Sequence, residues 1–172
     1  MHTRKARLPD AVRIHEIIAQ FAARDVLLPR SLAEICENVR DFVVAEEAGQ
    51  IIGCGALHLY GTHLAEIRSI AVDPGYQGSG AGGWLVRALL AEAAQHRVAC
   101  VCLFTRIPDF FARFGFTVAN RDELPDKIYK DCLQCPKLYA CDEIAMVRGT
   151  LPRTAIIERE HIIRPLVLPT AR

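Results

Sequence analysis

The chain has 172 residues, of which 51% are hydrophobic and 24% charged, and its formal net charge is +1. This length suits one domain with a sizeable core, and the ordinary charged fraction excludes disorder as the default state. A net charge near zero gives no general attraction to nucleic acid or an anionic membrane. The longest apolar runs are far shorter than the roughly 18 residues that span a bilayer. The seven cysteines are too few for a disulfide scaffold, so we expect a cytoplasmic protein.

The first part of the chain predicts a strand, two helices and a hairpin. A strand is expected at residues 3–8 and a helix from Asp10 to about Asp25, where apolar residues recur at helical spacing. A second helix begins at Ser31, because Ser31 and Glu34 fit a capping box. Strands at residues 42–46 and 51–60 then flank a turn.

The second part alternates strands with helices. A strand at residues 64–73 leads through the glycine-rich turn 77–83 into a helix that ends near His96. Residues 98–105 form a nearly continuous apolar run, which is typical of a strand covered on both faces. A short helix at residues 108–114 ends before Gly115, and residues 144–147 form the last strand.

The chain end differs from the rest. Residues 149–172 combine three prolines with many apolar side chains. We expect one domain at residues 1–148 and an extension at 149–172 that packs on this domain or on a second subunit, with a homodimer as one arrangement.

The glycine-rich turn admits three interpretations. Its glycines fit G-x-G-x-x-G, but no carboxylate follows at the end of the next strand, as a dinucleotide site requires. A phosphate loop of the Walker type needs a lysine where Trp84 stands. The third interpretation is Q-x-x-G-x-G, formed by Gln77, Gly80 and Gly82, which resembles the coenzyme A loop of GNAT acetyltransferases. A helix N-terminus there would bind the diphosphate of the coenzyme.

The resemblance to GNAT acetyltransferases extends over the whole predicted order of elements. It includes the strand 65–74 and the segment Phe110–Phe116, which matches the F-Y/F-x-x-x-G-F helix of the family. It implies an α+β fold with a mixed, mostly antiparallel sheet, splayed at the acetyl-CoA site and covered by helices on both faces. It also implies acetyl-CoA as co-substrate and direct acetyl transfer to an amine.

A narrower resemblance is to the acetyltransferase domain of N-acetylglutamate synthases, in particular their short stand-alone form. The segments 27–31, 52–57, 65–74 and 104–116 carry it. It implies acetylation of the α-amino group of glutamate, or of glutamine, as the first step of arginine biosynthesis. Another small amine, a protein amine or a non-catalytic acetyl-CoA sensor remain as alternatives.

The resemblance also assigns the coenzyme site. Backbone groups of the strand before the loop would pair with pantetheine, and a backbone N–H near Ile70 would face the thioester oxygen. The residues expected to contact acetyl-CoA are Ile70, Ala71, Val72, Gln77, Gly78, Ser79, Gly80, Ala81, Gly82, Phe111 and Phe114.

Glu66 is the candidate general base, because an otherwise apolar strand gains nothing from burying a bare carboxylate. The alternative is a surface glutamate paired with Arg68. Many family members carry a tyrosine acid where Phe111 stands here, so water or Tyr129 would protonate the leaving thiolate.

The candidate substrate-binding residues are cations. Arg30 is expected to bind the α-carboxylate through two parallel hydrogen bonds, as its place in Leu-Pro-Arg-Ser resembles the carboxylate-binding arginine of the synthases. Arg68, Lys127 and Lys137 are further candidates for a substrate carboxylate.

A cluster of three cysteines, at positions 132, 135 and 141, has spacing that suits zinc or a redox pair. Reduced thiols in a substrate loop are the simpler interpretation, and we predict no bound metal. The other four cysteines lie on apolar faces and are expected in the core.

Overall fold

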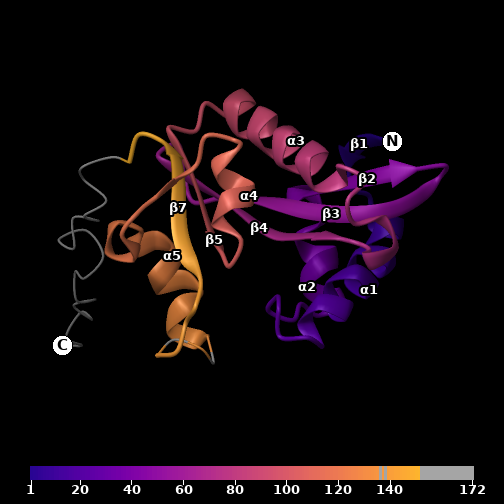
Figure 1. Ribbon diagram of the computed structural model, residues 1–172, viewed down its shortest axis with the longest axis horizontal. Coiled ribbons are helices and arrows are strands. Elements are labelled where there is room, and N and C mark those ends of the chain that lie inside the picture. Colours follow the sequence, from indigo (N-terminus) through magenta and orange to yellow (C-terminus); the bar gives the residue numbers. More distant parts are fainter. Residues whose placement is uncertain (136, 138, 152–172) are drawn as a thin grey trace, which may run out of the picture.

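The computed structural model describes residues 1–135, 137 and 139–151. Its centre is a seven-stranded sheet with the order β1-β2-β3-β4-β5-β7-β6, shown in Figure 1. Neighbouring strands are antiparallel except β4 and β5, which are parallel. The strands are β1 (His2–Lys5), β2 (Phe42–Glu47), β3 (Gln50–Leu59), β4 (Leu64–Val72), β5 (Cys100–Thr105), β6 (Thr117–Val118) and β7 (Ile144–Gly149).

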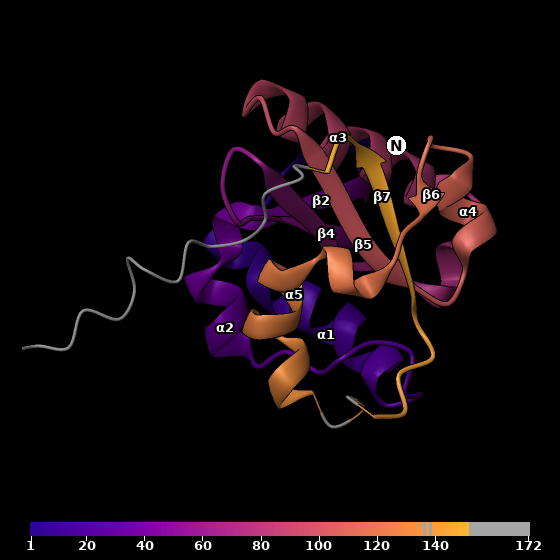
Figure 2. The same cartoon turned by 90° about the vertical axis from the view of Figure 1, so that its left-hand side faces the viewer.

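Helices cover both faces of this sheet. In Figures 1 and 2, α3 lies on one face, and α1, α2 and α5 lie on the other. The helices are α1 (Ala11–Ala22), α2 (Leu32–Glu37), α3 (Ala81–Gln95), α4 (Pro108–Ala112) and α5 (Pro125–Lys130). The predicted fold class, a mixed and mostly antiparallel α+β sheet with helices on both faces, is confirmed.

The apolar pattern of the chain determines how α1 and α2 pack. Ile14, Ile17 and Ile18 follow the helical period and are almost completely buried against Val44 and Cys54 of the sheet. The capping box that begins α2 is also present, since Ser31 Oγ accepts from the Glu34 N–H at 3.2 Å and Glu34 Oε2 accepts from the Ser31 N–H at 2.8 Å. Both features could be recognised in the sequence because each depends on neighbouring residues alone.

The sheet opens between β4 and β5. Their parallel pairing joins Leu64–Glu66 to Cys100–Cys102, and no pairing between the two strands continues beyond Glu66 in the described structure. At Ser69, whose φ is +53°, the β3–β4 register shifts by a bulge. Such a bulge bends a strand and increases its twist. The predicted splay is therefore confirmed, and it leaves the backbone of residues 70–72 open on the side of β5.

Several boundaries differ from the predictions. The helices α1 and α4 end earlier than expected, and β7 continues to Gly149, which the predicted division at residue 148 had assigned to the extension. The short β6 and the helix α5 were not predicted, because two residues and six residues are too short for a clear period. Residues 152–172, most of the predicted extension, lie outside the described residues.

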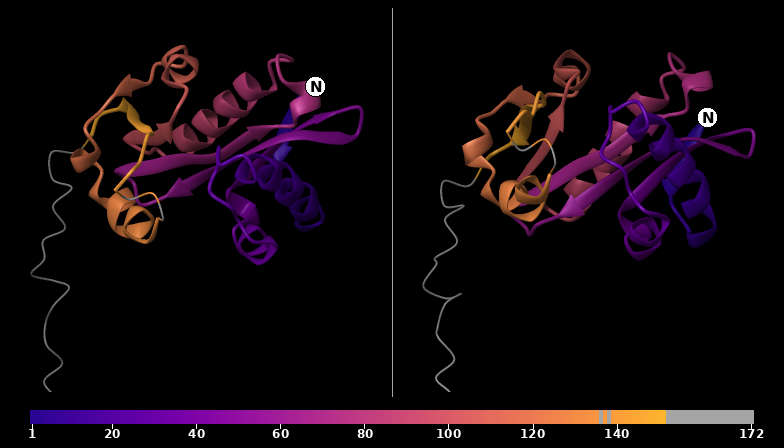
Figure 3. Two further views of the ribbon diagram at one scale, coloured as in Figure 1. Left: turned by 60° about the horizontal axis from the view of Figure 1, so that its bottom comes forward. Right: turned by 90° about the horizontal axis from the view of Figure 1, so that it is seen from below.

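Figure 3 shows α5 on the same side of the sheet as α1 and α2. Leu124, just before α5, packs with Leu64, Cys100, Cys102 and Ala145 in an apolar cluster. This packing holds the start of α5 against the parallel strands β4 and β5. Within the described part of the chain, the helices lack the length and apolar character that crossing a bilayer requires.

Candidate active site

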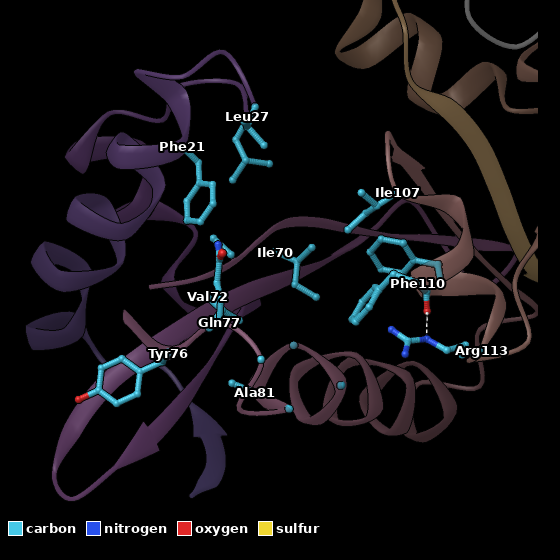
Figure 4. A pocket seen from close by; sticks show the side chains of 17 residues that line it. Phe21, Leu27, Ile70, Val72, Tyr76, Gln77, Ala81, Ile107, Phe110 and Arg113 are labelled. Atoms are coloured by element: carbon cyan, nitrogen blue, oxygen red, sulfur yellow. Dashed lines mark hydrogen bonds between the residues drawn. The ribbon is translucent and has the colours of Figure 1, made fainter. Parts of the chain in front are cut away.

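An apolar cleft of about 500 Å³ lies at the opening between β4 and β5. Figure 4 shows its side chains converging from the loop after α1, from β4, from the start of α3 and from α4. The lining residues are Phe21, Val26, Leu27, Ile70, Ala71, Val72, Tyr76, Gln77, Gly78, Gly80, Ala81, Gly82, Gly83, Ile107, Phe110, Phe111 and Arg113.

The glycine loop forms the floor of this cleft at the N-terminus of α3. Gly78 and Gly80 have φ of +83° and +87°, a conformation that favours glycine. A Cβ on Gly82 would lie 3.2 Å from Cζ of Phe110, so the close packing of Phe110 against this turn favours a residue without a side chain. The first N–H groups of a helix lack helical acceptors. The loop therefore fits an anionic diphosphate.

Nine of the eleven residues predicted to contact the coenzyme line the cleft. The exceptions are Ser79, whose Oγ accepts from the Ala81 N–H at 3.4 Å, and Phe114, which packs against Phe110. Contact of these two residues with the coenzyme stays a prediction.

Other lining residues were not predicted, namely Phe21, Val26, Leu27, Tyr76, Gly83, Ile107, Phe110 and Arg113. For Phe21 the sequence predicts only a place on the apolar face of α1, because the neighbouring residues do not indicate that this face extends into a cleft.

Glu66 is the last residue of β4 that pairs with β5, and its side chain is almost completely buried. Its Oε2 accepts from the Tyr60 hydroxyl at 2.8 Å, and its Oε1 lies 2.7 Å from Nζ of Lys127. The alternative of an exposed glutamate paired with Arg68 is wrong. A buried carboxylate held by one hydroxyl and one ammonium is a compensated charge. Burial, together with this carboxylate, raises the pKa of Tyr60 well above its usual range, so Tyr60 remains a hydrogen donor.

Lys127 joins Glu66 to a second carboxylate. Its Nζ lies 2.9 Å from Oδ2 of Asp131, which lies 3.5 Å from Nη1 of Arg68. Burial alone would lower the pKa of Lys127, but Glu66 and Asp131 outweigh it and the pKa is raised. Burial opposes ionisation of Asp131, but Lys127 and Arg68 together lower its pKa. Lys127 thus binds two carboxylates of the protein itself, which the sequence did not reveal because α5 was not predicted.

Arg30 and Arg68 line one small polar pocket together with Asp41 and Ser69. Arg30 comes from the loop before α2, and its Nη1 is 3.8 Å from Oε1 of Glu34. Arg68 points from β4, and its Nη2 lies 3.2 Å from Nδ1 of His58. The structure therefore brings two of the four predicted substrate-binding cations to one pocket, one residue along β4 from the coenzyme cleft.

The remaining predicted cation, Lys137, forms an ion pair with Asp25 in the loop after α1. This contact links the cysteine-bearing segment to the loop that borders the cleft. Arg106 also contacts this loop, since its Nη1 donates a hydrogen bond to the Asp25 carbonyl at 2.6 Å. Tyr129, the alternative acid, has a side chain outside the described part of the structure.

The cysteines of the 132–141 segment are free. Burial raises the pKa of the Cys132 thiol, and Arg121 Nη2 lies 3.8 Å from its sulfur. Among the described residues, no three His, Cys, Asp or Glu side chains are placed to hold a metal ion, so the zinc alternative gains no support. Cys54, Cys100 and Cys102 are buried in the core as predicted, whereas Cys36 is half-buried.

A splayed sheet with a glycine loop at its opening defines a class of acyl-CoA-dependent transferases. The profile of the acetyltransferase (GNAT) domain matches residues 38–118. An uncharacterized N-acetyltransferase of Chlorobaculum tepidum is 43% identical over 145 residues, which are 84% of this chain and 94% of that protein. This chain belongs to the GNAT acetyltransferase family and is an enzyme that uses acetyl-CoA as co-substrate.

Relatives with a more specific name are also found. An amino-acid acetyltransferase of Mycobacterium tuberculosis is 39% identical over 117 residues, 66% of this chain and 67% of that protein. A structure from the same organism, in complex with CoA and NLQ, has a TM-score of 0.76 at 30% identity and covers 88% of this chain and 100% of its own.

N-acetylglutamate synthase from Neisseria gonorrhoeae, complexed with coenzyme A and N-acetyl-glutamate, has a TM-score of 0.77 at 27% identity. The match covers 88% of this chain but 35% of the synthase. The chain thus corresponds to about a third of that longer protein.

Proposed function

We propose that this enzyme transfers the acetyl group of acetyl-CoA to the α-amino group of glutamate or glutamine in the cytoplasm, as the first step of arginine biosynthesis. The observation that carries the proposal is the shared pocket of Arg30 and Arg68 beside the coenzyme cleft. The names and ligands of the related amino-acid acetyltransferase and N-acetylglutamate synthase support it.

Arg30 is proposed to bind the α-carboxylate of the amino acid. A guanidinium presents two parallel N–H groups that match the two oxygens of a carboxylate. Its contact with Glu34, at 3.8 Å, is long for a hydrogen bond, and the Glu34 side chain is half exposed. A substrate carboxylate can therefore replace this partner at small cost. Arg68, from the neighbouring strand, would add a second positive charge at the same pocket.

Glu66 is proposed as the general base. It is absent from the linings of both the cleft and the polar pocket, so the proton of the substrate amine would reach it through a water molecule. Lys127 and Tyr60 orient its two oxygens, and we propose that Lys127 acts mainly by positioning Glu66. Lys137 would help to close the amino-acid site through its contact with Asp25.

Acetyl-CoA supplies an activated acetyl thioester when it is bound. The backbone of residues 70–72 is proposed to hold its pantetheine arm, because these residues are not paired with β5. An N–H group near Ile70 would stabilise negative charge on the thioester oxygen. Phe111 is buried and lacks a proton to donate, so water would protonate the leaving thiolate.

The test is a thiol-release assay of the protein with acetyl-CoA and each of the amino acids, together with a peptide amine. We expect turnover with glutamate or glutamine to exceed turnover with every other amine by at least about tenfold. Preference for a peptide amine, or for an amine without a carboxylate, would overturn the proposal. Acetyl-CoA binding without turnover on any amine would favour a sensor.

Arg30→Ala sharpens this test. Loss of a charge-assisted hydrogen bond costs about 1.5–3 kcal/mol, so the KM for the amino acid should rise about tenfold to a hundredfold while the KM for acetyl-CoA stays constant. Arg40→Ala is the matched control, because Arg40 is an exposed arginine near the same pocket in sequence and does not line it. An equal loss for both substrates would remove Arg30 from carboxylate binding.

A further inference from the structure

Two arginines outside the proposed amine site lie beside the glycine loop. Arg87 belongs to the second turn of α3, and its Nη1 would lie 3.4 Å from a Cβ on Gly83. Arg113 follows α4 and lines the coenzyme cleft, where Figure 4 shows it next to Phe110. Both side chains therefore place a guanidinium near the anion-binding end of the cleft.

The rings of Phe110 in α4 and of Phe114 just after α4 pack against these guanidinium groups. Arg113 Cζ lies 5.1 Å from the ring centroid of Phe110, and Arg87 Cζ lies 5.5 Å from that of Phe114. The two rings pack together with centroids 5.4 Å apart. Arg113 Nε also donates to the Phe110 carbonyl at 3.5 Å. A guanidinium stacked on a ring keeps its outer N–H groups available to a ligand.

The charge around the two arginines is uncompensated. Within the described ranges, neither guanidinium forms an ion pair, whereas Arg4, Arg13, Arg68 and Arg106 all do. Arg113 is the one charged residue among those found in the lining of the cleft. The outer end of the cleft is thus positive without an acidic neighbour in its wall.

The chemistry of coenzyme A identifies an anion for this position. The molecule carries a diphosphate and a separate phosphate on the ribose 3′-oxygen, beyond the diphosphate as seen from the thioester. The loop at the start of α3 suits the diphosphate, and Arg87, in the second turn of this helix, comes one turn after Gly83. We propose that Arg87 and Arg113 bind the 3′-phosphate and make the enzyme selective for 3′-phosphorylated coenzyme A.

This inference concerns the coenzyme alone, so it can fail while the proposed amine substrate is correct, and the reverse also holds. The experiment is calorimetric titration of the unmodified protein with coenzyme A and with 3′-dephospho-coenzyme A. We expect coenzyme A to bind about tenfold more tightly than 3′-dephospho-coenzyme A, because one charge-assisted hydrogen bond contributes about that much affinity. The preference should shrink as salt rises, because the arginines are exposed. Equal affinities would overturn the proposal.

The variants assign the preference to residues. In Arg113→Ala the affinity for coenzyme A should fall towards the affinity for the dephospho form, and in Arg87→Ala/Arg113→Ala the two affinities should become equal. The affinity for the dephospho form should stay unchanged in both variants. Arg113→Lys should keep part of the preference, since the charge remains but the planar stacking is lost. Arg40→Ala is the control, because Arg40 is exposed and absent from the lining of the cleft. Equal weakening of both ligands would show a structural role instead and would overturn the assignment.

Discussion

The two sides of the sheet opening are built in different ways. The proposed coenzyme side is built around one continuous stretch of chain, residues 70–83, which apolar side chains of α1, of the loop after α1 and of α4 enclose. The proposed amine side joins residues that come from separate segments and carry most of the charge, namely Arg30, Tyr60, Glu66, Arg68 and Lys127. A local loop can act through backbone N–H groups and conformation, whereas a buried charge network needs partners that tertiary packing brings together. Substitutions should therefore affect binding on the first side, and turnover and stability on the second.

The largest effect is expected for Glu66→Gln. A general base contributes about 10²–10⁴-fold to the rate, and the amide lacks a basic oxygen. Turnover should fall by that range in a thiol-release assay, while coenzyme A affinity measured by calorimetry stays unchanged. Glu37→Gln, at an exposed site of α2, is the control. Unaltered turnover would exclude Glu66 from proton transfer.

Lys127→Met should mainly lower the free energy of unfolding. Removal of the ammonium leaves Glu66 buried without its countercharge, which costs about 3–5 kcal/mol. Urea unfolding measures this loss. Lys130→Met, one turn later in sequence but exposed, should cost less than about 1 kcal/mol. Similar losses for the two variants would show that the Glu66–Lys127 pair adds nothing specific.

Gly80→Ala tests the coenzyme side. Gly80 has φ of +87° and open space where a Cβ would stand, so alanine introduces backbone strain alone. That strain is about 1–2 kcal/mol; the free loop relieves it by leaving this conformation, which bound coenzyme A must restore, so coenzyme A affinity should fall about fivefold to thirtyfold. Gly49→Ala at the β2–β3 turn, with φ of +79° and equally open space, should leave this affinity unchanged. A matching loss in Gly49→Ala would refute a local effect of the loop.

The smallest effect concerns pH. The folded protein lowers the pKa of Asp131 below its ordinary value of 3.8. Asp131 therefore stabilises the protein fully above about pH 5, and this contribution is lost as pH falls through the folded pKa. In urea unfolding, Asp131→Asn should be less stable than the unmodified protein at pH 6, and the difference should narrow towards pH 3. A constant difference would contradict the ion pairing.

The prediction from sequence succeeded where neighbours in the chain suffice. The helical spacing of Ile14, Ile17 and Ile18, the capping box at Ser31 and the glycine loop all depend on residues within one or two turns. It failed for α5 and β6, which are short and lack a clear period. For this reason the contact of Lys127 with Glu66 was not predicted.

The sequence by itself determined the fold class, the coenzyme loop and the residues that line most of its cleft. The helices and strands follow from local periodicity, whereas the fold class and the coenzyme residues follow from the resemblance to GNAT acetyltransferases that the glycine loop, the strand 65–74 and Phe110–Phe116 carry. Only the tertiary structure decided which charges meet, since Lys127 reaches Glu66, and Arg68 shares a pocket with Arg30, from segments more than 30 residues distant along the chain. A charge is stabilised or made available by its neighbours in space, and the order of residues along the chain does not reveal them.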